Sequence, residues 1–217
     1  IESAWALREG DAQRVVAVGH DAPIEPQTLL YLDRVGLIGK DLLRPFDQRH
    51  DGCLLGEGAA ALVLETEASA LARGATVLGE YLGGGDASEG EGLFCIRADG
   101  DGLSRAIELA LADAQLTPAD VGMIVAHGNG TQESDASETA ALLRVFGTDM
   151  PPVTGFKWSV GHLFAASGLL DVAVGLEACR RKVVPGIATL EQLADSCQGL
   201  NVSKQTRAPR SDVVLVL

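Results

Sequence analysis

Short apolar runs alternate with amphipathic segments along most of this chain. The apolar runs have the length and composition of buried strands, whereas the amphipathic segments repeat their apolar positions about every 3.6 residues, as helices do. The pattern predicts strands at 14–18, 53–65, 76–82, 121–126, 151–155 and 211–217. It predicts helices at 1–10, 29–35, 67–74, 102–116, 133–146 and 163–181. Such alternation is typical of an α/β layered fold, and we expect its sheet to be largely parallel.

Both ends of the chain lie inside predicted elements. The opening IESAWALREG belongs to a helix, and the closing SDVVLVL reads as a buried strand with no polar cap after it. Chain ends usually lie in exposed, weakly ordered segments. We therefore expect residues 1–217 to be one portion of a longer protein.

Composition and charge narrow the choice of function. The 217 residues are 47% hydrophobic and 22% charged, which is ordinary for a globular domain. The net charge of −13 argues against nucleic acid as a partner, because phosphates are bound by clustered lysine and arginine. No uncharged apolar run reaches the roughly 18 residues of a membrane-spanning helix, so we expect no membrane span.

The four cysteines, Cys53, Cys95, Cys179 and Cys197, lie far apart in the sequence. Their spacing matches neither a zinc site nor a disulfide framework, which favours a reduced, cytoplasmic protein. None has the basic or helix-start surroundings that lower the pKa of a thiol, so we expect none to be a nucleophile.

Two histidines in glycine-flanked segments carry the strongest chemical signal. His127 follows the predicted strand 121–126, and His162 precedes the predicted helix 163–181. Ligands of α/β folds bind at the carboxyl ends of the strands. A histidine after a strand often has only a structural role, but the glycines after His127 leave polar groups open to a ligand. We therefore expect His127 to contact substrate.

The position of His162 at a helix start predicts a neutral imidazole, since the helix dipole disfavours a positive charge there. A neutral imidazole can donate its N–H to a carbonyl oxygen. Helix capping is the alternative role for this residue.

Lys157 lies between apolar residues in GFKWS, so we expect it to have a carboxylate partner. Asp135 and Glu138 are three residues apart on one helix face, and we predict that Glu138 is the partner. Alternatively, Lys157 is a surface residue whose stem packs on a neighbouring tryptophan. A metal site formed by His127, Asp135 and Glu138 is a further alternative, but this spacing is no recognised ligand pattern, and we expect no metal.

Three segments in succession resemble the motifs of the β-ketoacyl-acyl-carrier-protein synthases of the thiolase-like fold. LLRPFDQRHDGCLLGEGAAALVLE resembles the segment PFD-x-x-R-x-G-x-x-x-GEGA. AHGNGTQESDASETAALLRVFG resembles the block HGTGT…D…E, and GFKWSVGHLFAASGLLDV the block K-x-x-x-GH-x-x-x-A-x-G. The resemblance covers nearly the whole chain. It implies that residues 1–217 are the C-terminal half of an α/β/α/β/α ketosynthase.

The resemblance implies a decarboxylative Claisen condensation in fatty acid or polyketide synthesis. Malonyl on a carrier protein loses CO₂, and the enolate attacks an acyl group held as a thioester on a cysteine. His127 and His162 would stabilise the negative charge on the malonyl thioester oxygen. Lys157, paired with Glu138 and supported by Asp135, would orient the site.

Asn129 and Thr131 would contact the phosphopantetheine arm that carries the substrate, and no other cofactor is implied. The family's nucleophilic cysteine and its FGFGG loop are not in this chain. Asn129 replaces a threonine of the family motif, and Cys53 replaces an aromatic residue.

The implied partners are the N-terminal half of the same enzyme, a second ketosynthase subunit in a homodimer or heterodimer, and an acidic acyl carrier protein. Since the chain itself is acidic, we expect a local basic patch for the carrier protein. The candidates are Arg34, Lys40, Arg44 and Arg49.

A non-catalytic subunit like a chain-length factor is the main alternative function. The presence of both histidines and Lys157 argues against it. A cysteine just upstream of Ile1 would favour the enzyme, whereas glutamine or alanine there would favour the subunit. A metal-dependent hydrolase is a third hypothesis.

Overall fold

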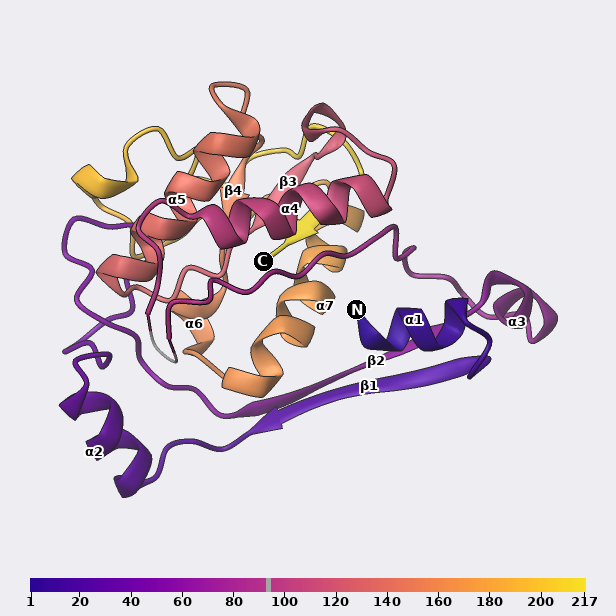
Figure 1. The fold of residues 1–217 in the computed structure, drawn as a ribbon, viewed down its shortest axis with the longest axis horizontal. Helices are drawn as coiled ribbons and strands as arrows, with labels where there is room; N and C mark the ends of the chain where they lie inside the picture. Colours follow the sequence, from indigo (N-terminus) through magenta and orange to yellow (C-terminus); the bar gives the residue numbers. More distant parts are fainter. Residues whose placement is uncertain (93–94) are drawn as a thin grey trace.

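The fold, taken from a computed structural model, is described for residues 1–92 and 95–217. The strands within these residues form two sheets (Figure 1). The strands are β1 (Arg14–Asp21), β2 (Gly58–Glu65), β3 (Met123–Val125), β4 (Val153–Thr154) and β5 (Val214–Val216). The α-helices are α1 (Glu2–Arg8), α2 (Pro26–Arg34), α3 (Glu67–Ala72), α4 (Asp101–Asp113), α5 (Gln132–Phe146), α6 (Lys157–Val160) and α7 (Ser167–Arg180). Short 3₁₀ turns occupy Pro118–Asp120, Phe164–Ala166 and Asp195–Cys197.

The two sheets differ in the direction of their strands. In the C-terminal sheet, β3 lies between β4 and β5, and all three strands are parallel. In the other sheet, β1 pairs with β2 along their full length, and the pair is antiparallel. The prediction of a largely parallel sheet therefore holds for the C-terminal sheet only.

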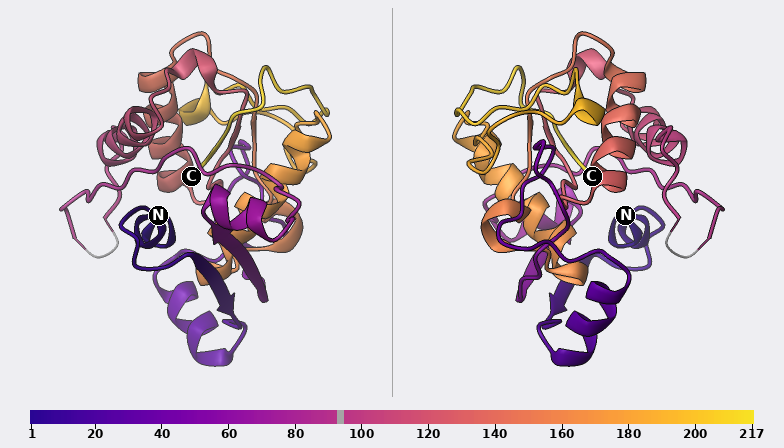
Figure 2. Two further views of the ribbon diagram at one scale, coloured as in Figure 1. Left: turned by 90° about the vertical axis from the view of Figure 1, so that its right-hand side faces the viewer. Right: turned by 90° about the vertical axis from the view of Figure 1, so that its left-hand side faces the viewer.

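Helix α7 lies between the two sheets and contacts strands of both (Figures 1 and 2). The alternation of side chains along β3 explains how the layers stack. Met123 and Val125 pack against α7, whereas Ile124 belongs to the core beneath α4 and α5. Gly175 brings α7 close to β3, because a Cβ there would lie 3.0 Å from a methyl group of Val125. The result is an order of sheet, helix, sheet and paired helices.

Two predicted strands differ in the structure. The run 76–82 forms no strand, and its Val77 and Leu78 are exposed. Its Gly79 lies against Leu176 of α7, and Gly83, just after the run, allows close approach to Ala114 at the end of α4. The predicted strand 53–65 begins only at Gly58, since the preceding residues make isolated bridges to other segments.

One face of the β1–β2 sheet is apolar and open to solvent. Val16, Val18 and Val63 point away from α7, and their exposures are 61, 61 and 63%. Such an apolar patch usually marks a contact surface. Among the residues described, no helix is both long and apolar enough to span a membrane.

Candidate active site

The two histidine segments meet at one place in the fold. His127 follows β3, and His162 lies between α6 and α7. Their ring centroids are 5.2 Å apart, and the ring planes cross at 84°. Both side chains are partly buried. The two rings are therefore close enough to act on one small ligand group.

Backbone contacts with the segment before β2 fix His162. Its N–H donates to the carbonyl oxygen of Leu54 over 2.8 Å, and its own carbonyl oxygen accepts the N–H of Gly56 over 3.0 Å. Gly161 has a φ of 79°, and a Cβ there would lie 2.7 Å from the nitrogen of Gly56. Both the conformation and the close approach favour glycine just before the histidine.

Glu138 holds the segment of His127, and the predicted ion pair of Glu138 with Lys157 is wrong. The Glu138 carboxylate accepts the backbone N–H groups of His127 and Gly128 over 2.6 and 2.9 Å. These groups lie beyond the end of β3, and buried N–H groups need an acceptor. Burial raises the pKa of Glu138 to about 7. Its role in the structure is to fix the backbone after β3.

Lys157 pairs with Asp171 of α7 instead. The Nζ of Lys157 lies 2.8 Å from the Oδ2 of Asp171, and each side chain is only 2% exposed. Burial raises the pKa of Asp171, and the ammonium group of Lys157 opposes this rise. The pair holds α6, which immediately precedes the His162 segment, against α7.

Both imidazoles are held in the neutral form. Burial is the larger cause and the charge of Lys157 the next, and together they lower the pKa of His162 to about 4. Burial, Lys157 and His162 lower the pKa of His127 to about 3. The sequence predicted a neutral His162 from the dipole of a helix starting beside it. A 3₁₀ turn, Phe164–Ala166, separates His162 from α7, so burial is the main reason.

We expect the His127→Gln variant to lose less stability in acid than the original protein. An unfolded histidine has a pKa near 6.5, so between about pH 6.5 and 3 only the unfolded chain takes up this proton. Stability therefore falls with falling pH by up to about 1.4 kcal/mol per pH unit because of His127. Denaturant unfolding from pH 7 to 4 measures both slopes.

The raised pKa of Glu138 has the opposite effect on stability, because the folded protein takes up a proton there as the pH falls. Since Glu138 is present in both proteins, this effect does not change the comparison of their slopes. Unfolding free energies at pH 8 provide the baseline, since an unfolded histidine is then neutral. Equal slopes for the two proteins between pH 6 and 4 would contradict the assignment of His127 as a buried neutral imidazole.

Asp135 links the His127 turn to the loop at 45–50. The carboxylate is fully buried, accepts the N–H groups of Phe46 and Gly130 over 2.7 and 3.2 Å, and lies 2.8 Å from Nδ1 of His50. Burial raises the pKa of Asp135. Asp135 thus holds the turn after His127 at Gly130 and joins it to the loop at 45–50.

Asn129 and Thr131 bond to each other in the turn between His127 and α5. The Oδ1 atom of Asn129 accepts both the backbone N–H and the hydroxyl of Thr131, each over 2.9 Å. Thr131 is buried and stands directly before α5. These two hydrogen bonds fix the conformation of the turn that follows His127.

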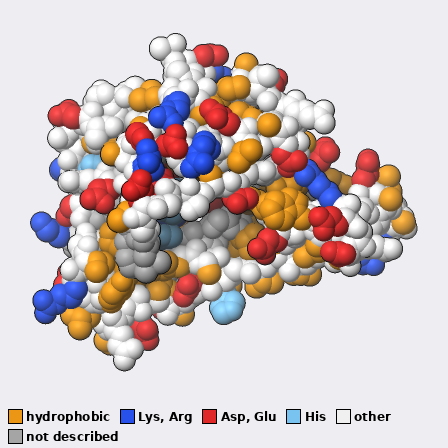
Figure 3. Space-filling model, viewed as in Figure 1, with side chains coloured by type: hydrophobic (Ala, Val, Ile, Leu, Met, Phe, Trp, Pro, Cys, Tyr) orange, Lys and Arg blue, Asp and Glu red, His pale blue; other side chains and the backbone are white. Residues whose placement is uncertain are grey.

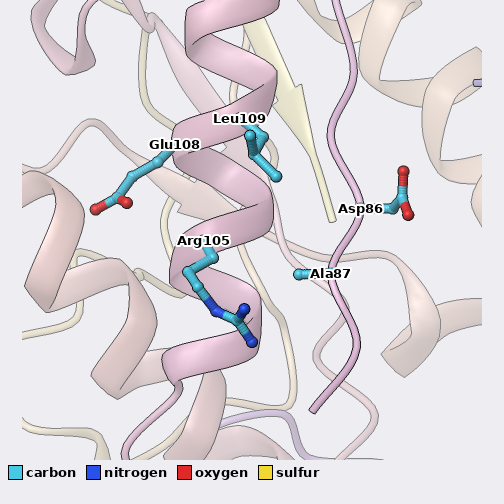
Figure 4. A pocket seen from close by; sticks show the side chains of 5 residues that line it. All are labelled: Asp86, Ala87, Arg105, Glu108 and Leu109. Atoms are coloured by element: carbon cyan, nitrogen blue, oxygen red, sulfur yellow. The ribbon is translucent and has the colours of Figure 1, made fainter. Parts of the chain in front are cut away.

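Two hollows differ in their relation to the histidines. The larger, of about 360 Å³, lies between α4 and the segment at Asp86 and Ala87. Figure 4 shows that the carboxylates of Asp86 and Glu108 point away from the gap between Ala87 and Leu109. A smaller hollow, of about 250 Å³, includes His127. It is lined by Glu89, Ile96, Leu103, His127, Ser134, Ser137, Glu138 and Leu217. The smaller hollow reaches the candidate site at His127 and Glu138.

The remaining chemical groups point to no second centre. Within residues 1–92 and 95–217, no cluster of three or more His, Cys, Asp or Glu side chains is placed to hold a metal ion. Cys53, Cys179 and Cys197 are buried, and burial raises the pKa of each thiol. These three residues are therefore held as thiols.

The predicted basic patch is smaller than expected. Arg44 is 9% exposed and forms two hydrogen bonds with Asp41, so it does not belong to an open patch. Arg34 and Lys40 are exposed, as is Arg49, which lies 3.5 Å from buried Asp47. Figure 3 shows basic side chains at the lower left, over the α2 end of the molecule.

Sequence reasoning missed three residues of this site. Asp171, Ser167 and His50 each contact a group that the sequence did single out. Asp171 had a signal, because it is the one charged residue in the apolar stretch SGLLDVAVG. Ser167 and His50 had none beyond their closeness to the motifs.

Comparison with known proteins gives a consistent answer. Residues 1–70 match the sequence family "Beta-ketoacyl synthase, N-terminal domain", and residues 78–191 match "Beta-ketoacyl synthase, C-terminal domain". The chain is 35% identical to the tetracenomycin polyketide synthase ketoacyl synthase alpha subunit of Streptomyces glaucescens. That match covers 96% of this chain and 51% of the relative, so the chain spans about half the length of the relative.

Solved structures agree with this result. The ishigamide ketosynthase/chain length factor superimposes with a TM-score of 0.89 at 31% identity, over 97% of this chain and 52% of that one. A type II polyketide ketosynthase, AntDE, in complex with its acyl-carrier protein AntF superimposes with a TM-score of 0.92 at 26% identity. This second match covers 100% of this chain and 55% of the solved one. The likeness supports the predicted thiolase-like layered fold.

Proposed function

This chain belongs to the beta-ketoacyl synthase family, and we propose that it supplies the histidines and the lysine of a decarboxylative condensation site. The protein containing it would join an acyl thioester to malonyl carried on a carrier protein, in polyketide or fatty acid synthesis. The observation that carries this proposal is the meeting of two neutral imidazoles, 5.2 Å apart, beside a buried Lys157–Asp171 pair.

The proposed role of His127 and His162 follows from their charge state. When malonyl loses CO₂, the electron pair of the broken C–C bond moves into an enolate, and negative charge grows on the thioester oxygen. Neutral imidazoles can donate N–H groups to that oxygen, and fixed donors in a site of low polarity lower the barrier most. The enolate carbon then attacks the acyl thioester, and the thiolate leaves.

Lys157 has two roles in this proposal, one through its positive charge and one through its ion pair with Asp171. Its charge helps keep both imidazoles neutral, and its bond with Asp171 holds α6 beside the His162 segment. Asp171 therefore takes the partner role that we had predicted for Glu138. Glu138 and Asp135 would support the loop of His127 from its other side.

Asn129 and Thr131 would receive the phosphopantetheine arm of the substrate. Their mutual hydrogen bonds set the shape of the turn directly after His127, where a thioester would enter. The arm belongs to the carrier protein, so no further cofactor is proposed. We also propose that the rest of the ketosynthase covers the open apolar face of β1–β2, at Val16, Val18 and Val63.

Arg34→Glu combined with Lys40→Glu should weaken binding of an acidic carrier protein. Both side chains are exposed, and reversal of charges at the edge of an interface mainly slows association and makes it less sensitive to salt. We expect KM for the malonyl carrier protein to rise about tenfold at low salt, with little change in kcat. Steady-state kinetics at two salt concentrations measure both effects, with exposed Arg105→Glu as control. Equal KM for all three proteins would contradict the docking role.

The test of the proposed function uses the natural gene product that contains this chain. Radiolabelled malonyl-carrier protein and an acyl donor are supplied, CO₂ release is counted, and the product is identified by mass spectrometry. A β-ketoacyl product supports the proposal. Absence of CO₂ release from the protein alone, with product of changed length when it is paired with an active ketosynthase, would overturn it in favour of a chain-length-factor-like subunit.

A further inference from the structure

The side chain of Ser167 lies next to the imidazole of His162. Ser167 is the first residue of α7 and is only 5% exposed. Its Oγ atom lies 3.0 Å from the Nδ1 atom of His162. The same oxygen accepts the backbone N–H of Leu163 over 2.9 Å. The hydroxyl is therefore fixed on one side by a backbone donor and faces the histidine ring on the other.

The donors around His162 define which ring nitrogen carries the proton. The backbone N–H of Phe164 points at Nδ1 over 3.3 Å, and a backbone N–H can only donate. The Ser167 oxygen already accepts from Leu163, so its hydrogen is available for Nδ1. Nδ1 is thus an acceptor for two donors. A neutral imidazole with Nδ1 as acceptor has its proton on Nε2.

We propose that Ser167 is a positioning residue that holds His162 in the Nε2–H tautomer and aims this N–H at the substrate oxygen. The hydroxyl makes the shorter contact, because the Phe164 N–H at 3.3 Å is longer than the usual hydrogen-bond range. Ring stacking of His162 on Phe164, at 4.7 Å and 14°, sets the plane of the ring but not its tautomer. The N–H of Phe164 excludes a proton on Nδ1, and the hydroxyl adds the shorter of the two hydrogen bonds that hold the ring.

This inference deepens the proposed function, since it matters for catalysis only if His162 stabilises the enolate oxygen. Its first test needs no activity. The natural gene product is labelled with ring-¹⁵N histidine, and the signal of His162 is assigned with the His162→Gln variant. We expect the chemical shifts of a single tautomer with protonated Nε2. A protonated Nδ1 would overturn the inference at once.

Ser167→Ala is the informative variant. We expect the two nitrogen signals of His162 to move toward each other as the tautomers mix, whereas those of His127 stay unchanged. The groups around the ring other than Ser167, which are Phe164, His127 and the charge of Lys157, are left in place by the substitution. Ser167→Cys keeps a weaker donor, so the separation of its two nitrogen signals should be intermediate between those of the original protein and of Ser167→Ala. It replaces the alanine variant if that variant does not fold.

Kinetics separate this role from a structural one. With Ser167→Ala we expect kcat for malonyl decarboxylation to fall about tenfold, the effect of one lost hydrogen bond, with little change in KM. Ser104→Ala is the matched control, because Ser104 is a buried serine of α4 whose hydroxyl donates to a backbone carbonyl oxygen. It should leave kcat unchanged.

The two kinds of measurement distinguish the two proposals. A shift of tautomer in a protein without decarboxylase activity would support the inference and count against the proposed function. Normal decarboxylation together with unchanged ¹⁵N signals in Ser167→Ala would support the proposed function and overturn the inference.

Discussion

Lys157→Met should cost about 3–5 kcal/mol of unfolding free energy at neutral pH, since it leaves a buried carboxylate without its partner. Asp171 is 2% exposed, and its Oδ2 lies 2.8 Å from the lost ammonium group. Urea unfolding curves measure the loss as a shift of the midpoint at constant slope. The loss should shrink as the pH falls, because burial raises the pKa of Asp171 and a protonated carboxyl is tolerated there.

The double variant Lys157→Met with Asp171→Leu tests whether the loss comes from the unpaired carboxylate. Replacement of a buried ion pair by apolar residues of similar size is often neutral, so most of the lost stability should return. Lys204→Met is the control. Its ion pair with Glu191 is about half exposed, and such pairs contribute roughly 1 kcal/mol or less. A single variant at Lys157 no worse than this control would show that the buried pair does not stabilise the fold.

Helices and strands whose apolar positions repeat regularly could be predicted from the sequence. Contacts between residues far apart in the sequence could not. The helix expected at 133–146 is α5 almost residue for residue, because its apolar positions repeat at helical spacing and Gly147 ends it. The strand before His127 was equally clear. By contrast, the run 76–82 looks like a strand locally, but its Val77 and Leu78 are exposed and its Gly79 lies against Leu176 of α7. Tertiary contacts decided its conformation.

The error over Lys157 has the same origin. A buried lysine requires a carboxylate, and this requirement was correct. We predicted Glu138 as the partner from its position on a helix face. In the structure its carboxylate accepts the backbone N–H groups beyond β3, and Asp171 on another helix pairs with the lysine. Chemistry gave the need for a partner, whereas only the fold could identify it. The same holds for Ser167, whose contact with His162 depends on the turn at Phe164–Ala166.

His127→Ala and His162→Ala should each reduce the rate of malonyl decarboxylation by about 10²–10³-fold, because each removes one donor to the developing oxyanion. We expect the loss in kcat rather than in KM, since the charge on the oxygen appears mainly in the transition state. The double variant should lose less than the product of the two single effects, because the rings act on one oxygen and stand 5.2 Å apart. Release of labelled CO₂ from malonyl-carrier protein by the natural gene product measures all three.

Glutamine at the same positions provides the matched comparison. His162→Gln keeps an N–H donor in place of the ring, so it should retain more decarboxylation than His162→Ala if hydrogen bonding to the oxygen is the role of the residue. Urea unfolding of each variant separates lost chemistry from lost structure. Decarboxylation at the original rate in either alanine variant, with the fold intact, would remove that imidazole from the proposed oxyanion site. If both variants behaved so, the meeting of the two rings would have to be explained by packing alone.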